Sequence, residues 1–207
     1  ATLIAVLIYF GRDISGLVRQ RRANWLFYIA IGTVPAVLAA LLFEEGIEAF
    51  FTDTGKVAVM LIVTGLVLFA GQAALWLRKG KGAGPNYKTS TSVGISQAFA
   101  LLPGISRSGM TISAALLGGM RPAEAFRFSF LLSIPAVSGA LLYKSLTTEA
   151  LSEVSGNLLN YVTGMSAALL TGLLSLRFLW WVMSKRKLYV FGIYCIALGT
   201  FCIFFCK

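Results

Sequence analysis

Pro103-Gly-Ile-Ser-Arg-Ser-Gly-Met-Thr111 is a short polar stretch that contains two glycines and lies inside a long apolar region of the chain. Proline removes a backbone donor and clashes inside a helix, and glycine permits a sharp turn, so Pro103-Gly104 predicts a break between two short helices. We expect the first helix over residues 93–102 and the second over about residues 107–117, with Ser106 as its N-cap.

The composition indicates that lipid, rather than water, surrounds most of the chain. Of its 207 residues 57% are hydrophobic and only 13% are charged, with a mean hydropathy of +0.81, whereas a soluble domain has about 25% charged residues. The net charge of +10 does not predict binding of nucleic acid, because the basic residues lie between apolar runs and form no continuous polar face. We therefore expect a single all-α transmembrane domain over residues 1–207.

Five apolar segments approach or exceed the roughly 20 residues that a membrane crossing needs. They are residues 24–43, 57–77, 126–143, 158–183 and 188–206. The opening run, residues 1–10, would reach only about 15 Å as a helix, which is half the hydrocarbon thickness, so we expect a truncated first helix and a missing natural N-terminus. The cysteines all lie in the last segment and, in a chain without histidine, are expected to be buried thiols and not metal ligands: Cys195, Cys202 and Cys206.

The connectors between these segments alternate in charge. By the positive-inside rule, the basic ones are expected in the cytoplasm: 11–22, 78–88 and 184–187. The acidic ones are expected outside: 44–56 and 144–157. Two spans account for the crossings between the second and third basic connectors, so the segment 89–125 must begin and end on the same side. It is therefore predicted to be a re-entrant hairpin, with Gly118-Gly119 ending its second helix and Pro122 beginning the next.

The turn at residues 103–106 and the helix turn after it form the predicted site. Irregular backbone at membrane depth is tolerated where it is buried in protein or lines a water-filled cavity. A helix N-terminus offers free N–H groups and a positive dipole end to an anion, and Arg107 adds a planar guanidinium suited to two parallel hydrogen bonds with a phosphate. The other predicted phosphate- or diphosphate-binding residues contribute hydroxyls or allow close approach to the backbone: Gly104, Ser106, Ser108, Gly109 and Thr111.

An arginine inside the membrane costs several kcal/mol, so Arg107 is expected to need an anion. The eight acidic residues all lie in connectors or at their edges: Asp13, Glu44, Glu45, Glu48, Asp53, Glu124, Glu149 and Glu153. We therefore expect Arg107 to have no carboxylate partner at its own depth in this chain. Its partner would be an external anion or a further part of the protein, and the alternative is that it reaches a headgroup or backbone carbonyls.

Of three other polar residues, two leave alternatives open. Gln97, six residues before Pro103, either faces the same cavity as Arg107 and helps to bind the ligand, or forms a hydrogen bond between helices. Arg127 either lines the site or has a structural role. Arg177, near the cytoplasmic end of its span, is expected to extend to the membrane surface.

Two stretches of the chain resemble a known family. Residues 94–111, Gly-Ile-Ser-Gln-Ala-Phe-Ala-Leu-Leu-Pro-Gly-Ile-Ser-Arg-Ser-Gly-Met-Thr, resemble the second signature of the undecaprenyl-diphosphatase family, the bacitracin-resistance membrane phosphatases. Residues 124–135, Glu-Ala-Phe-Arg-Phe-Ser-Phe-Leu-Leu-Ser-Ile-Pro, are also similar to that family. The order of spans and connectors extends the resemblance over the whole chain.

The resemblance implies a fold of two inverted repeats, each with a re-entrant hairpin, that meet near the middle of the membrane. It implies hydrolysis of undecaprenyl diphosphate to undecaprenyl phosphate and inorganic phosphate, which recycles the lipid carrier for cell-wall synthesis and confers bacitracin resistance. The enzyme would lie in the bacterial inner membrane, act on a polyprenyl diphosphate lipid, and could form a homodimer. Ser106, Arg107 and Thr111 match the residues that bind the diphosphate or assist its hydrolysis, so they are the predicted catalytic residues.

The first signature of that family, Glu-x-x-x-Glu followed by Pro-x-Ser-Ser-x-Gly-His, does not occur in these residues. Its glutamates are the expected groups for a divalent cation (Mg or Ca) or for a general base, so no metal ligand is predicted in this chain. We expect the intact enzyme to be active and residues 1–207 alone to be inactive. Two other functions stay open: a transporter or flippase for polyprenyl phosphates that uses the same anion site, and a membrane scaffold. Release of inorganic phosphate from a diphosphate lipid separates the enzyme from the transporter, whereas a scaffold predicts that substitution of Arg107 is neutral or stabilising.

Overall fold

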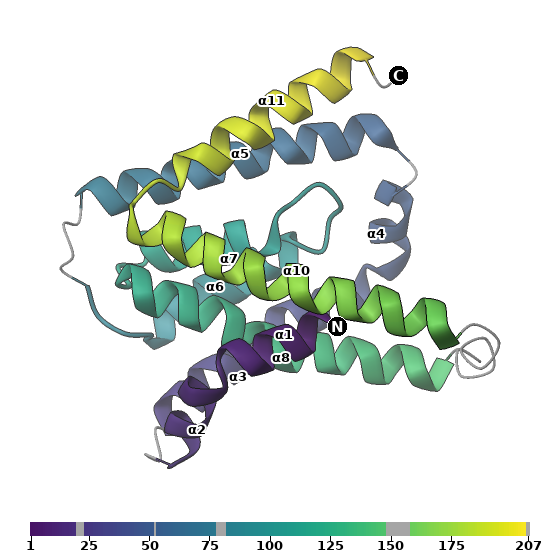
Figure 1. The fold of residues 1–207 in the computed structure, drawn as a ribbon. Helices are drawn as coiled ribbons and strands as arrows, with labels where there is room; N and C mark the ends of the chain where they lie inside the picture. The colour runs from purple at the N-terminus through teal and green to yellow at the C-terminus, as the bar shows by residue number, and fades with distance from the viewer. Residues whose placement is uncertain (20–22, 52, 78–81, 148–157, 206–207) are drawn as a thin grey trace.

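The structure is a computed structural model, which describes residues 1–19, 23–51, 53–77, 82–147 and 158–205 (Figure 1). The described residues form α-helices and no β-strand, as the all-α prediction requires. The helices, in chain order, are α1 (Thr2–Tyr9), α2 (Gly11–Arg19), α3 (Ala23–Leu42), α4 (Glu44–Phe51), α5 (Thr54–Leu77), α6 (Tyr87–Phe99), α7 (Arg107–Leu117), α8 (Pro122–Thr147), α10 (Leu158–Ser184) and α11 (Tyr189–Phe205).

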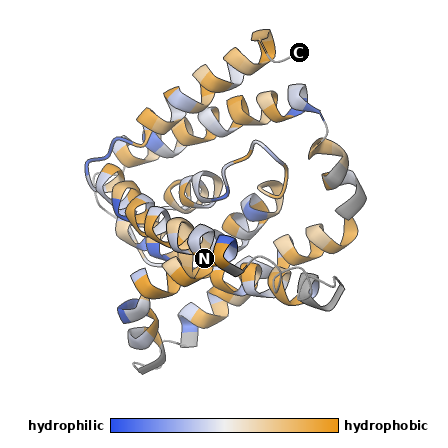
Figure 2. Cartoon of the chain, turned by 45° about the vertical axis from the view of Figure 1, so that its right-hand side comes forward, coloured by the Kyte–Doolittle hydropathy of each residue, from blue (hydrophilic) through white to orange (hydrophobic). Residues whose placement is uncertain are grey.

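Four of the predicted spans are confirmed as helices that are long and apolar enough to cross a membrane. They are Asn24–Leu42, Thr54–Leu77, Pro122–Tyr143 and Leu159–Ser184. The fifth predicted span is α11, an apolar helix of 17 residues, which is about 25 Å long at 1.5 Å per residue. Figure 2 shows hydrophobic residues along most of the helices, and on α10 the side chains of Leu170 and Leu174 are 63% and 67% exposed. So much exposed apolar surface is unfavourable in water and fits a lipid environment, so the chain is a multi-pass membrane protein.

Two connectors contain helices that the sequence did not predict. Residues 11–22 were expected to form a loop, yet they contain α2, and the loop expected at 44–56 contains α4. Charge places such segments outside the hydrocarbon core but does not prevent helix formation, because Glu and Arg are good helix formers. In α2, Leu17 is buried and Arg12 is exposed, so this helix lies with one face against the bundle.

Asp53 marks the beginning of α5 in the acidic connector. The backbone N–H of Lys56 donates to Asp53 Oδ1 over 3.1 Å, which is the arrangement of a helix N-cap. This hydrogen bond, together with the Lys56 ammonium 3.3 Å from Oδ2, holds the pKa of Asp53 below its ordinary value. The carboxylate therefore stays ionised at neutral pH at the end of the span that is predicted to face outside.

Helices α6 and α7 form the predicted helical hairpin. The predicted first helix, 93–102, was wrong at both ends: α6 begins at Tyr87, because the Asn86 side chain accepts from Thr89 N over 3.0 Å and caps it, and it ends at Phe99. Helix α7 has the predicted bounds, with Ser106 as its N-cap. With 13 and 11 residues, the two helices are about 20 and 17 Å long, too short to cross a bilayer alone, which agrees with the re-entrant path that the charges predict.

The hairpin lies in the interior of the bundle. Helix α7 packs against α5, α6 and α8, and α6 packs against α3 (Figure 1). Val93 of α6, together with Ile112 and Ala115 of α7, is at most 1% exposed. The approach of α7 to α5 is close at Gly71, where an added Cβ would lie 2.5 Å from Ser113 Oγ. The hairpin is therefore held as a packed core element, which fixes the position of the turn that it carries.

Gln72 fastens α5 to the turn between α10 and α11. Its side chain is fully buried, its Nε2 donates to the carbonyl of Arg186 over 2.9 Å, and its Oε1 accepts from Tyr189 N over 3.1 Å. One amide thus satisfies two backbone groups of a turn in which Arg186 has φ +54°. Helix α5, which also contacts the hairpin, is joined in this way to α11 beside it (Figure 1).

Replacing Gln72 with leucine is expected to destabilise the protein by about 2 kcal/mol, because the carbonyl of Arg186 and the N–H of Tyr189 lose their partner. Thermal unfolding in detergent micelles measures the change. Thr171→Val is the matched control, since the Thr171 hydroxyl is exposed on α10 and donates only to its own helix. Equal unfolding temperatures for the two variants would contradict the role assigned to Gln72.

Candidate anion-binding site

The turn between α6 and α7 is shaped by Gly104 and attached to α5 by a threonine. Gly104 has φ +88°, a left-handed conformation that suits glycine. The Thr64 hydroxyl, almost fully buried, donates to the carbonyl of Gly104 over 3.1 Å and accepts from Ser106 N over 3.1 Å. Thr64 therefore binds the turn on both sides of Ile105. This role was not predicted, since Thr64 is a single hydroxyl inside an apolar span.

Ser106 caps the N-terminus of α7, where two backbone donors have no recorded partner within the described residues. Its Oγ accepts from Gly109 N over 3.1 Å, which confirms the predicted N-cap. Among the residues that the structure describes, no protein acceptor is recorded for the backbone N–H groups of Arg107 and Ser108. Free N–H groups and the positive end of the helix dipole favour an anion at this position.

Arg107 is bound on one edge by Gln97 of α6. Its Nε and Nη2 donate to Gln97 Oε1 over 3.1 and 2.6 Å, so the hydrogen bond between helices that was one alternative for Gln97 is present. Within the described residues Arg107 forms no ion pair. The edge formed by Nε and Nη2 is thus partly used, and a phosphate would bind at the end of the guanidinium, through Nη1 and the second proton of Nη2.

Gln97 also holds an unused donor. Its side chain is 2% exposed, and its Nε2 is buried without a hydrogen-bond partner in the described part of the chain. Buried polar groups are almost always paired, so an unpaired amide N–H beside a guanidinium that has no ion pair in the described part of the chain indicates that an acceptor belongs here.

A cavity of about 270 Å³ opens beside Arg107. Its lining residues come from three helices. They are Thr2, Leu3 and Val6 of α1, Arg107 and Ser108 of α7, and Ser129, Phe130, Ser133 and Val137 of α8. The cavity is therefore amphipathic, with a cation and hydroxyls together with aliphatic and aromatic walls. Ser129 and Ser133 were not predicted as site residues, although they lie in the second stretch that resembles the family, residues 124–135.

Three predicted binding residues serve the packing of the site. The space beside Gly104 is filled by the carbonyl of Val57, and a Cβ on Gly109 would lie 3.0 Å from Ser106 Oγ. Protein atoms therefore fill the space on the side of each glycine where a Cβ would stand, and the prediction that their backbone is open to a ligand stays a prediction. Thr111 is 1% exposed, and its Oγ lies 2.9 Å from the carbonyl of Arg107 and 2.6 Å from Ser129 Oγ. Because the Thr111 side chain is buried, a role in positioning other groups of the site is favoured over direct contact with a ligand.

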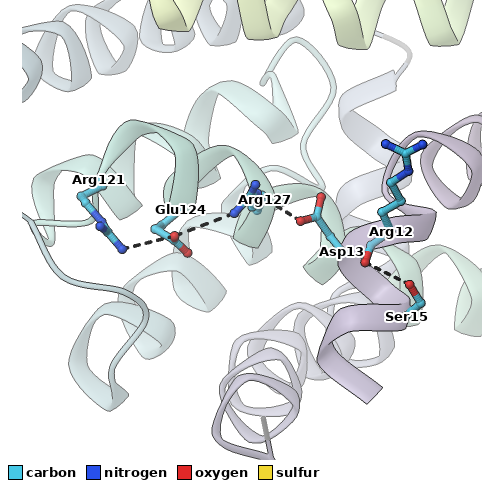
Figure 3. A network of polar contacts seen from close by, with 6 residues as sticks. All are labelled: Arg12, Asp13, Ser15, Arg121, Glu124 and Arg127. Carbon is cyan, nitrogen blue, oxygen red and sulfur yellow. Dashed lines mark hydrogen bonds and ion pairs between the residues drawn. The ribbon is translucent and has the colours of Figure 1, made fainter. Parts of the chain in front are cut away.

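Arg127 lies in a different cavity. It forms an ion pair with Asp13 of α2 over 3.2 Å and a longer one with Glu124 over 4.0 Å, and Figure 3 shows it between these two carboxylates. This second cavity, about 250 Å³, shares no lining residue with the first. Of the two alternatives for Arg127, the structure supports the structural one.

The groups around Arg107 do not form a metal site. In the described ranges, no three His, Cys, Asp or Glu side chains lie close enough together to hold a metal ion. The surroundings of Arg107 offer hydrogen-bond donors and a permanent positive charge, which suit an anion. The divalent cation implied by the family resemblance thus finds no ligand set among these residues, and we assign it no step.

Fold and site together define a multi-pass membrane protein in which a broken helical hairpin presents an arginine and a helix N-terminus to an amphipathic cavity. The model of the family described as "Bacitracin resistance protein BacA" matches residues 1–201, and the chain belongs to this family.

Relatives of the chain carry one common name. A protein named undecaprenyl-diphosphatase from Christiangramia forsetii is 37% identical over 213 residues, which cover 99% of this chain and 79% of the relative. One of the same name from Thermomicrobium roseum is 37% identical over 220 residues, covering 96% and 78%. A third, from Methanothermobacter thermautotrophicus, is 39% identical over 175 residues, covering 83% of this chain and 94% of the relative. The resemblance found in residues 94–111 is thereby confirmed over nearly the whole chain.

Proposed function

We propose that this protein hydrolyses undecaprenyl diphosphate to undecaprenyl phosphate and inorganic phosphate. Membership of the bacitracin-resistance family and the common name of its relatives support this reaction. The observation that carries the proposal is the joining, in one cavity, of the Arg107 guanidinium with an apolar wall. A lipid diphosphate has this combination of a charged head and an apolar chain.

The head of the substrate fits the end of the cavity formed by α7. Arg107 Nη1 and the backbone N–H groups of Arg107 and Ser108 are donors without a recorded partner among the described residues. Each hydrogen bond to a charged oxygen contributes roughly 1.5–3 kcal/mol. An arginine at the centre of a bilayer costs about 2.5–3.5 kcal/mol by insertion scales, so a bound diphosphate would offset its cost.

The same donors suit the chemistry of the reaction. Water attacks the terminal phosphorus, the bond from that phosphorus to the bridging oxygen breaks, and the lipid phosphate leaves with the electron pair. Fixed donors that stabilise negative charge on the transferred and leaving groups lower such barriers strongly. We assign this role to Arg107. Ser106, whose oxygen is occupied by the N–H of Gly109, is assigned to binding and not to nucleophilic attack, because no base lies among its recorded partners.

The remaining expectations belong to the same proposal. We place the enzyme in the bacterial plasma membrane, as a homodimer, with a divalent cation held by groups outside the set around Arg107. Transport of a polyprenyl phosphate would use the same anion site without breaking a bond. The names of the relatives favour hydrolysis over transport.

The test is the release of inorganic phosphate from undecaprenyl diphosphate by the purified full-length protein in detergent micelles. We expect release that depends on protein concentration and stops when undecaprenyl diphosphate is consumed. Binding of the lipid without any phosphate release, with or without added Mg²⁺ or Ca²⁺, would exclude the phosphatase and favour transport.

Gln97 provides a sharper prediction about the same site. Gln97→Glu places a carboxylate where Oε1 now lies 2.6 Å from Arg107 Nη2, so it pairs with the guanidinium and competes with the substrate. We expect KM to rise about 10-fold or more, the equivalent of one hydrogen bond between charged groups. Gln97→Met is the control, since it removes the acceptor without adding charge and should change KM less. A lower KM in Gln97→Glu than in Gln97→Met would contradict this arrangement.

A further inference from the structure

Helix α8 brings two hydroxyls to the cavity that contains Arg107. Ser129 and Ser133 line it together with Arg107 and Ser108 of α7. The Ser133 hydroxyl donates to the carbonyl of Phe130 over 2.6 Å, so its proton is already used. The Ser129 hydroxyl has only another hydroxyl as its recorded partner, that of Thr111. Ser129 is therefore the group on α8 whose proton can be redirected.

The hydroxyls of Ser129 and Thr111 form a short chain that ends on the backbone of Arg107. Thr111 Oγ lies 2.9 Å from the carbonyl of Arg107, and 2.6 Å separates it from Ser129 Oγ. A hydroxyl has one proton, so when Thr111 donates to Arg107, Ser129 must donate to Thr111. In the opposite arrangement Thr111 donates to Ser129, and the O–H of Ser129 is free to point into the cavity.

The opposite arrangement leaves no group of the helix unpaired. In an α-helix the backbone N–H of Thr111 points at the carbonyl of Arg107, four residues before it, so this carbonyl keeps a donor when the Thr111 hydroxyl turns away. Reversal of the chain therefore costs little in the protein, and it presents a new O–H donor to an anion in the cavity.

We propose that Ser129 is a diphosphate-binding residue, which donates to a phosphate oxygen while Thr111 donates to it. Thr111 is then a positioning residue that acts through Ser129. This explains why a buried threonine accompanies the anion site although its side chain is 1% exposed. The inference rests on the proposed function for the identity of the ligand, and it adds a second wall, on α8, to the site on α7.

The experiment measures binding and hydrolysis separately. Binding of a farnesyl diphosphate analogue with a methylene bridge in place of the bridging oxygen, which cannot be hydrolysed there, is measured for the purified full-length protein in detergent micelles. Ser129→Ala is expected to weaken binding about 10-fold, as for the loss of one hydrogen bond to a charged group. Thr111→Val is expected to weaken it similarly and Thr111→Ser to retain it, because serine keeps the hydroxyl.

A double variant tests whether the two hydroxyls act in series. If Thr111 acts through Ser129, then Thr111→Val together with Ser129→Ala weakens binding no more than Ser129→Ala alone. Independent contacts would instead multiply their effects, which would overturn the relay. Ser90→Ala is the matched control, since Ser90 is a buried serine of α6 whose hydroxyl has no recorded partner and does not line the cavity.

The outcomes for this inference and for the proposed function are distinct. Unchanged affinity in Ser129→Ala, at an unchanged unfolding temperature, overturns the inference even if the wild-type protein hydrolyses undecaprenyl diphosphate. Affinity that depends on Ser129 in a wild-type protein without hydrolysis supports the inference and overturns the phosphatase. If Ser129→Ala does not fold, Ser129→Cys preserves the size of the side chain and replaces the hydroxyl with a weak donor, so it is expected to show the same loss of affinity.

Discussion

Arg107→Ala is expected to lower the rate of phosphate release from undecaprenyl diphosphate by roughly 10³-fold, the scale seen when a charged donor is removed from a phosphoryl-transfer site. Among the described residues, Arg107 is the only cationic side chain that lines the cavity beside α7. Its Nη1 is free for the diphosphate because Gln97 binds the opposite edge. Steady-state kinetics with undecaprenyl diphosphate in micelles measures the loss in kcat/KM.

The same substitution is expected to leave the protein folded, because two effects on stability oppose each other. The Oε1 of Gln97 loses its donors, which costs about 1–3 kcal/mol for a buried group. Arg107 is predicted to lie at membrane depth, and removal of an arginine from the centre of a bilayer returns about 2.5–3.5 kcal/mol. The unfolding temperature of Arg107→Ala should therefore lie close to that of the wild-type protein.

Arg177→Ala is the matched control for this prediction, since Arg177 is an exposed arginine of α10 that does not line the cavity. It should hydrolyse the lipid at the wild-type rate. Wild-type turnover in Arg107→Ala would remove the phosphatase mechanism, and higher stability in the same variant would favour a membrane scaffold instead.

The parts of the hairpin that could be predicted from sequence are those that local chemistry determines. Pro103 and Gly104 interrupt the helix, and Ser106 caps the next one, because these effects act over two or three residues. The beginning of α6 was missed although its cause is also local: the helix was predicted from residue 93, after the connector at 78–88, but the Asn86 side chain caps a helix that begins at Tyr87.

The parts that could not be predicted depend on residues distant in the sequence. Thr64, which binds both sides of the turn, is 40 and 42 residues from its partners. Ser129 is 18 residues from Thr111. No spacing rule links hydroxyls on separate helices, so their roles become visible only when α5 and α8 pack against α7.

Gly104→Ala is expected to abolish activity and to destabilise the protein. A side chain at φ +88° costs about 1–3 kcal/mol in backbone strain. The added Cβ would also meet the carbonyl of Val57, a backbone atom of α5 that cannot turn aside as a flexible side chain can. The turn must therefore move away from α5, which breaks its bonds with Thr64 and displaces the N-terminus of α7, including Arg107.

Gly139→Ala separates this effect from the general consequences of replacing a glycine. Gly139 lies in α8 with no atom within 4 Å of an added Cβ, so alanine there should be neutral or stabilise the helix by up to about 1 kcal/mol. Thermal unfolding and phosphate release are compared for both variants. If Gly104→Ala matched Gly139→Ala in both, the turn would be free to relax, and the position of Arg107 could not depend on its attachment to α5. A loss confined to Gly104→Ala would instead mean that the anion site depends on α5, which holds the turn in place, as much as on residues 103–111, which form the turn.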